Sequence, residues 1–168
     1  MLAVTTERSY DMIFDLTRIA ALIAVLGTAV VYGTDVFCAM VQRPALALID
    51  DGALVAVMGN VHLYGDRRMP LPGVVGIIAA AASAVLAAVA GHWTTAIAAA
   101  TALAILLVWL VLYLRVSKPI NQQLTAAAQA HDVPANARAL QAGWDRIINA
   151  RAILQGLAVC ALCIALMA

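Results

Sequence analysis

Long stretches with almost no charged residue are the feature that most constrains how this chain can fold. Residues 19–42 contain one charged side chain, Asp35, and residues 69–114 and 152–168 contain no Asp, Glu, Lys or Arg. An α-helix rises about 1.5 Å per residue, so about 20 apolar residues cross the ~30 Å hydrocarbon core of a bilayer. Each stretch is long enough, or nearly so, to cross a membrane, and the middle one can cross it twice.

The middle stretch is divided by the segment Gly91–Thr94 (GHWT), a polar and aromatic break of the kind found at a bilayer interface. We expect a tight turn there between two spans. The predicted fold is all-α: a single transmembrane domain over residues 1–168, built as an integral membrane four-helix bundle. The predicted spans cover approximately residues 19–41, 70–91, 93–115 and 147–167.

Composition excludes several classes of protein. With 65% hydrophobic and 11% charged residues, the chain has too little polar surface for a soluble globule. Its net charge of +1 leaves no basic stripe for nucleic acid. The sequence has no G-x-S-x-G, Walker A, G-x-G-x-x-G or H-E-x-x-H motif, and no metal site is predicted.

Basic residues gather on one side of the predicted bundle. Eight of the ten lysines and arginines, all but Arg8 and Arg18, lie in loop one (residues 42–69), in loop three (residues 116–146) or within five residues of loop three. Because cytoplasmic loops carry such an excess, we expect both loops in the cytoplasm and both termini outside, in a bacterial inner (plasma) membrane. The acidic N-terminal segment, with no cleavage signature after the first span, argues against a removable signal peptide.

Both basic loops are predicted to contain short amphipathic helices at the membrane interface. Apolar residues recur at helical spacing over approximately residues 44–66, where Asp50 and Asp51 are placed to cap a helix. A second helical region over approximately residues 120–146 is interrupted at residues 132–134, where a proline suits the first turn of the next helix.

Small residues spaced by four mark the second and third spans, and such stripes let helices approach closely in lipid. Packing within one bundle is the commoner use of these stripes, and a homodimer seam is the alternative. The stripes comprise Ala79, Ser83, Ala87 and Gly91, and Ala96, Ala100 and Ala104.

Polar residues gather at one membrane depth, near the loop ends of the spans. Charged and strongly polar groups inside a bilayer are costly and usually face a cavity or a partner. The residues predicted to line one pocket come from separate helix ends and are Asp35, His62, Asn121 and Arg151. Their polar neighbours are Asn60, Tyr64, Asp66 and Asn149.

A structural interpretation of the same residues stays open. Asp35 and Arg151 would then form an ion pair that fixes helix order. His62 and Asp66, four apart on a helix, would make an ordinary surface contact. Cys160 and Cys163 form a C-x-x-C, but membrane thiol oxidoreductases also need a second cysteine pair, and only Cys38 remains.

A family resemblance is carried by the last third of the chain. The segment Lys118–Leu124 (KPINQQL), then Trp144, then Asn149-Ala150-Arg151 at the start of the last span, resembles the DUF1772 or anthrone oxygenase-like family. That family of small four-span membrane proteins shows a P-x-N-x-x-L stretch, a tryptophan and an Asn/His-then-Arg element. Where relatives often carry His near the arginine, this chain has Asn149.

The resemblance implies an oxygenase that converts an anthrone to an anthraquinone with dioxygen. The base would be His62, oriented by Asp66, or else Asp35. Arg151 would stabilise the developing oxyanion with Asn121 and Asn149. The pocket would take a lipophilic aromatic or quinoid substrate, and the residues predicted to bind it are Asn60, Tyr64, Asn121, Trp144 and Asn149.

Two other functions fit the same residues. One is a haem-binding redox protein that uses His62 as axial ligand, a role that needs one histidine aimed into an apolar cavity. The other is a non-catalytic membrane subunit, or a binder of quinone or lipid, in which the polar cluster only fixes helix order.

Overall fold

The described chain is folded almost entirely into helices. A computed structural model describes the backbone of residues 2–168 and the side chains of residues 12–168, and no strand occurs in that part. The all-α prediction is confirmed. The elements are α1 (Leu2–Phe37), the π-helical η1 (Cys38–Gln42), α2 (Arg43–Leu46), α3 (Asp51–Arg68), α4 (Pro70–Val89), α5 (Trp93–Leu112), the π-helical η2 (Tyr113–Ser117), α6 (Lys118–Gln129) and α7 (Ala137–Met167).

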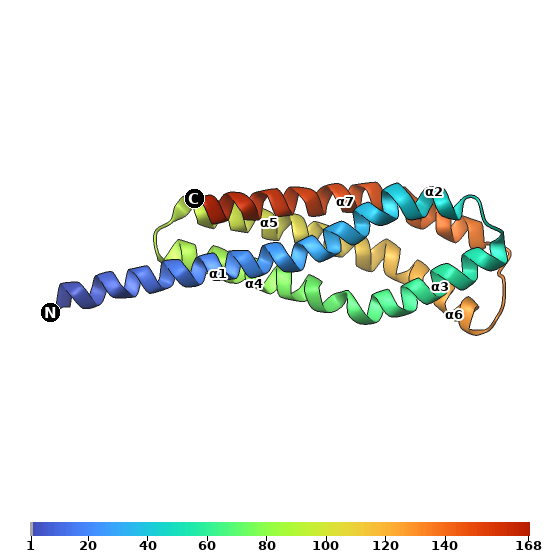
Figure 1. Cartoon of the computed structure of the whole chain (residues 1–168), viewed down its shortest axis with the longest axis horizontal. Helices are drawn as coiled ribbons and strands as arrows, with labels where there is room; N and C mark the ends of the chain where they lie inside the picture. Colours follow the sequence, from blue (N-terminus) through green and yellow to red (C-terminus); the bar gives the residue numbers. More distant parts are fainter. Residues whose placement is uncertain (1) are drawn as a thin grey trace.

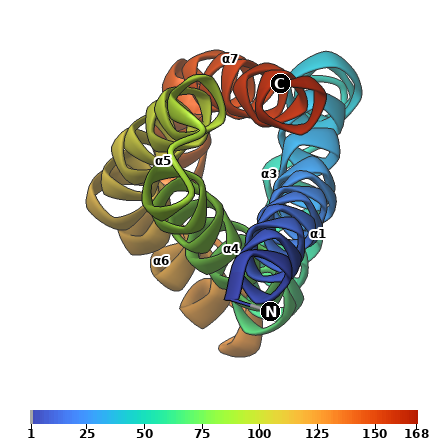
Figure 2. The same cartoon turned by 90° about the vertical axis from the view of Figure 1, so that its left-hand side faces the viewer.

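Four helical segments of the described chain are long and apolar enough to cross a membrane. Seen along the bundle in Figure 2, α1, α4, α5 and α7 stand around a common axis, and each packs against its two neighbours in that order. The molecule is therefore an integral membrane four-helix bundle, as predicted. The segments are Met12–Leu46, Asp51–Val89, Trp93–Gln129 and Ala137–Met167.

The two ends of the bundle carry different parts of the chain (Figure 1). Both termini and the α4–α5 turn lie towards one end, while α3, α6 and the connections at residues 47–50 and 130–136 lie at the other, here called the loop end. The predicted turn after α4 uses Gly91, whose φ of +78° is open to glycine. His92 N donates to Ala87 O at 2.9 Å and closes the helix end.

The loop helices extend the spans instead of forming separate segments. Only Met69 separates α3 from α4, and α5, η2 and α6 follow one another without a gap. The helix predicted over 44–66 is interrupted at residues 47–50, and Asp50 Oδ1 caps α3 by accepting from Ala53 N at 2.8 Å. The region predicted over 120–146 is interrupted at residues 130–136. Because α3 and α6 pack against each other, they form a second tier of the bundle at the loop end.

Small residues let the helices cross closely, but only one of the two predicted stripes is largely buried. Ala79, Ser83 and Ala87 of α4 are buried, whereas Gly91 lies exposed in the turn. On α5, Ala100 and Ala104 are exposed and the stripe is wrong beyond Ala96. A helix has 3.6 residues per turn, so a strict spacing of four drifts about 40° per step away from the contact face. The buried face of α5 instead follows Ala96, Ala99, Ala102, Leu106 and Trp109.

The closest crossing joins α1 and α4 at Gly27. A Cβ atom built there would lie 2.7 Å from Pro72 O and 2.9 Å from Gly76 N, both backbone atoms that cannot rotate away. We expect Gly27→Ala to force α1 and α4 apart and to lower the free energy of unfolding by about 1–3 kcal/mol. The measurement is thermal unfolding in detergent.

The matched control is Gly33→Ala on the same helix, where a Cβ atom meets nothing within 4 Å. Alanine gains about 1 kcal/mol of helix propensity over glycine, so this variant should be as stable as the parent or more so. Equal effects of the two substitutions would show that the α1–α4 contact is not close-packed at Gly27.

Candidate functional site

A cavity of about 360 Å³ lies between the helices towards the loop end. Its lining includes residues from α1, η1, α3, α4, α5, η2, α6 and α7, so every described helical element except α2 contributes to it. This volume is in the range of pockets that hold small organic ligands. Its buried polar and aromatic lining residues are Asp35, His62, Trp109, Asn121, Trp144 and Arg151.

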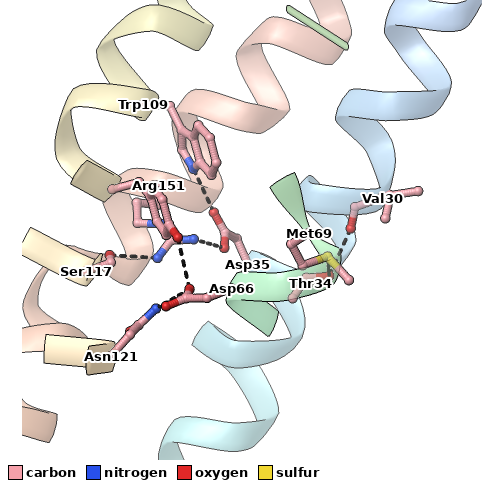
Figure 3. A network of polar contacts seen from close by, with 10 residues as sticks. Val30, Thr34, Asp35, Asp66, Met69, Trp109, Ser117, Asn121 and Arg151 are labelled. Carbon is pink, nitrogen blue, oxygen red and sulfur yellow. Dashed lines mark hydrogen bonds and ion pairs between the residues drawn. The ribbon is translucent and has the colours of Figure 1, made fainter. Parts of the chain in front are cut away.

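A buried ion pair between α1 and α7 forms one wall of the cavity. Arg151 Nη2 lies 2.6 Å from Asp35 Oδ1, and the two side chains are 8% and 2% exposed. Trp109 Nε1 donates to the other oxygen of Asp35 at 3.0 Å, and Arg151 Nη1 donates to Ser117 Oγ at 2.8 Å (Figure 3). The ion pair of the structural interpretation is therefore present, and it lies within the cavity wall.

Three aromatic rings surround the guanidinium of Arg151. Its Cζ lies 5.5 Å from the centroids of Trp109 and Trp144 and 5.8 Å from that of Tyr113. A cation held over aromatic faces is attracted by their quadrupoles, most strongly where water is excluded. The rings and the Asp35 carboxylate together hold Arg151 in one orientation beside the cavity.

A second polar cluster is centred on Asp66 of α3. Its Oδ1 accepts from Tyr113 Oη at 2.9 Å and from Asn121 Nδ2 at 2.8 Å. No hydrogen bond joins Asp66 to His62 among the described side chains, so the prediction that Asp66 orients His62 is wrong. The carboxylate reaches across the bundle to η2 and α6 because both present donors to it. The simple surface contact between His62 and Asp66 is equally not what the structure shows.

His62 is the histidine of the cavity. Its side chain is almost fully buried, with 4% exposed, and its ring lies 5.7 Å from that of Trp144. Among the described side chains it forms no hydrogen bond, and its Nε2 is buried without a partner. The imidazole is thus the basic side chain of the cavity that no carboxylate or arginine engages.

Further buried polar atoms beside the cavity have no partner among the described residues. They are Asn121 Oδ1, Trp144 Nε1 and Arg151 Nε. An unsatisfied buried polar group costs about 1–3 kcal/mol, so a molecule that supplied partners would be favoured there. With His62 Nε2, four unpartnered polar atoms therefore belong to residues that line the cavity.

Three of the predicted substrate-binding residues do not line the cavity. Asn60 and Asn149 are exposed, and Tyr64 is 52% exposed with its ring under Arg68. Residues two apart on a helix point to nearly opposite faces. Asn60 and Tyr64 are each two residues from His62, and Asn149 is two residues from Arg151, so all three point away.

Sequence reasoning missed residues on α5 and η2 that complete the site. Trp109, Tyr113 and Ser117 all bond to the polar clusters, and Asn121 continues the same spacing of four. The π-helical turn η2 lies within this row, and a π-turn holds more residues than an α-turn, which suits that spacing. A row of W-x₃-Y-x₃-S-x₃-N at the end of a span is the signal that could have identified them.

Each π-helical segment precedes a basic residue and a proline. Arg43-Pro44 follows η1, and Lys118-Pro119 follows η2. Proline has no N–H to donate and its ring clashes with the carbonyl four residues back, so the helix must deviate upstream. Both π-helical segments lie beside the cavity. Each widens its helix just before the chain enters the loop end of the bundle.

Comparisons of the chain with models of known protein families, with curated proteins and with solved structures found no match. The site is therefore interpreted from its own geometry and chemistry.

The ion pair can be tested by a double-mutant cycle. Removing one partner leaves an uncompensated buried charge, so Asp35→Asn and Arg151→Gln should each lower the free energy of unfolding by about 3–5 kcal/mol. The double variant should recover part of that loss, because neither charge is then left alone. Unfolding in detergent measures all four corners of the cycle.

The exposed pair Asp51–Arg138, at 2.6 Å, provides the comparison. Water and salt screen this pair, so Asp51→Asn should cost less than about 1 kcal/mol. Additive effects of the Asp35 and Arg151 substitutions would show that the buried pair is not coupled.

Proposed function

We propose that the protein is a membrane-embedded oxygenase of the anthrone oxygenase-like type, which acts on a lipophilic aromatic or quinoid substrate with dioxygen. The observation that carries the proposal is His62, an unengaged imidazole in a cavity walled by tryptophan rings within a membrane-spanning bundle. A flat apolar substrate would lie against these rings with its acidic C–H beside the imidazole.

The hydrogen bonds of the site favour His62 over the two carboxylates as the base. Asp35 is engaged by Arg151 and Trp109, and Asp66 by Tyr113 and Asn121. Each carboxylate is therefore already held by donors of the protein, whereas the imidazole of His62 is not. We assign the base to His62, Arg151 to the oxyanion, and Asp35 and Asp66 to positioning.

The oxyanion would be stabilised by the two unpartnered N–H donors, Arg151 Nε and Trp144 Nε1. Donors held in a site that excludes water stabilise developing charge more strongly than they would in bulk solvent. Asn149, the other donor predicted from the resemblance, is exposed and takes no part. Asn121 lines the cavity, with its Nδ2 engaged by Asp66.

The proposed reaction balances without another reactant. His62 removes a proton from the anthrone CH₂ group, and the resulting enolate donates its electrons to dioxygen as a C–O bond forms. The protonated imidazole returns the proton to the distal oxygen and gives a hydroperoxide. Loss of the second C–H proton then breaks the O–O bond, so that a ketone and one water are formed from CH₂ and O₂.

The haem-binding alternative depends on the same side chain, because His62 would be the axial ligand in the cavity. The ultraviolet–visible spectrum of purified protein before and after dithionite separates the two. A Soret band that shifts on reduction would favour haem. A featureless spectrum with anthrone turnover supports the oxygenase.

We expect His62→Ala to lower turnover of an anthrone by about 10²–10⁴-fold, the usual contribution of a positioned base. Dioxygen uptake and absorbance of the anthraquinone measure the rate. His92→Ala is the control, since His92 is exposed in the α4–α5 turn, and it should keep full activity. Turnover by the His62 variant at the parent rate would remove His62 from the mechanism. No turnover by the parent protein would favour a non-catalytic binder.

We also propose that the loop end faces the cytoplasm of a bacterial inner membrane and that both termini face outward. Support comes from the ten basic residues, of which seven lie within residues 43–68 and 115–146 at that end.

Labelling with a membrane-impermeant maleimide tests this orientation in a Cys160→Ser background, because Cys160 is exposed. Leu48→Cys, at a position 88% exposed in loop one, should react only after the membrane is opened. His92→Cys should react in intact cells. The reverse pattern would invert the orientation.

A further inference from the structure

The lining of the cavity is divided between a buried polar side and an exposed apolar side. On α3 and at the Met69 that follows it, His62 and Asp66 alternate with the neighbouring row of Val61, Gly65 and Met69. Val61 and Met69 are 44% and 36% exposed although they line the cavity. One row therefore faces inward and the other faces out of the bundle.

The opposite wall shows the same division. Trp109 and Tyr113 form the inner row of α5 and η2, while Leu110, Leu114 and Lys118 follow at each next position and form the outer row. Leu114 is 46% exposed. The outer row at the α3–α4 junction and the outer row at the α5–η2 junction face each other. The opening between these two rows is here called the window.

The window lies among exposed apolar residues of segments that are long and apolar enough to cross a membrane. Val74 of α4 also lines the cavity and is 52% exposed, and it belongs to the segment Asp51–Val89 that is long and apolar enough to cross the membrane. Beyond the window, α4 and α5 pack against each other, and α3 packs against α6 on the loop side. A molecule dissolved in the acyl chains would meet this opening directly.

One charged side chain lies in the outer rows of the window. Lys118 lines the cavity, is exposed, and makes no ion pair or hydrogen bond with any described side chain. The two carboxylates of the cavity are each held by donors of their own. The long apolar stem of Lys118 lets its ammonium group lie at the rim of the cavity, where it can bind an ionised acidic oxygen of a ligand.

We propose that the cavity takes its ligand directly from the bilayer through the window, and that this ligand is a flat, lipid-soluble molecule with one acidic hydroxyl, held by Lys118. The inference deepens the proposed function, because it names the entry route and the substrate class of the same site. The apolar body lies between the tryptophan rings, and the ionised oxygen stays at the rim.

Two probes with the same ring system test the contribution of the ionised hydroxyl separately from that of the apolar rings. They are 2-hydroxy-1,4-naphthoquinone, which is ionised at neutral pH, and 1,4-naphthoquinone, which is not. Binding is followed by quenching of tryptophan emission, since Trp109 and Trp144 line the cavity. Trp93, exposed at the opposite end of α5, is replaced by Phe to remove its background.

Lys118→Gln should weaken binding of the hydroxylated probe about five- to tenfold and leave the neutral probe unchanged, because one charge-assisted contact is lost. Arg115→Gln is the control, since Arg115 is a nearby cation that does not line the cavity. Equal losses for both probes, or an equal effect of the Arg115 control, would overturn the role of Lys118.

The window is tested in vesicles loaded with probe. Leu114→Trp should slow association at least several-fold, whereas Val111→Trp, exposed on α5 outside the lining, should not. Val74→Trp, with Val85→Trp as its control, repeats the test on α4 in case the first variant does not fold. Unchanged association in both window variants would show that the ligand enters elsewhere.

Binding assays keep this inference separate from catalysis. His62→Ala protein should still bind both probes if the base is catalytic only. If turnover fails while Lys118 and the window behave as stated, the proposed oxygenase is wrong and the binding site stands. If turnover succeeds while both probes ignore Lys118, the proposed ligand class is wrong.

Discussion

The ion pair between Asp35 and Arg151 is the interaction on which the rest of this structure depends. It joins the first and last spans at the depth of the cavity, with the two side chains 2% and 8% exposed. Breaking such a pair from one side costs about 3–5 kcal/mol, because the remaining charge is buried alone. Helix order around the bundle and the position of the cavity wall are therefore fixed by the same contact. A structural role and a functional role do not exclude each other here.

The second constraint is that the polar side chains must pack together inside the bundle so that no charged group faces the lipid. Trp109 and Ser117 each bond to one member of the ion pair; Trp109 lies four residues before the π-helical turn η2, and Ser117 is the last residue of that turn. Each π-helical segment precedes a proline, which cannot complete the regular bonding pattern of an α-helix. The π-helical turn that each proline imposes lies at the depth of the site, where a wider turn is needed to place the polar side chains. The local sequence therefore favours the same backbone geometry that the site requires.

The sequence predicts the fold well, because the spacing of charges and the breaker segment Gly91–Thr94 are local signals of helix length and helix ends. It also predicts that Asp35, His62, Asn121 and Arg151 lie close together, since their depth follows from helix length alone. It fails where the direction of a side chain matters. Depth does not distinguish Asn60 from His62, and only the period of the helix shows that they point to opposite faces.

The partners of each site residue are the part that sequence reasoning could not reach. The spacing of four between His62 and Asp66 suggests a local pair, but the carboxylate bonds instead to Tyr113 and Asn121 across the bundle. Asp66 bonds to these distant donors and not to His62 because a buried carboxylate needs several hydrogen bonds, and Tyr113 on η2 and Asn121 on α6 both face it. The consequence is chemical. Because Asp66 is held by other residues, the imidazole stays free beside the cavity, and a base that is free to accept a proton is what the proposed reaction requires.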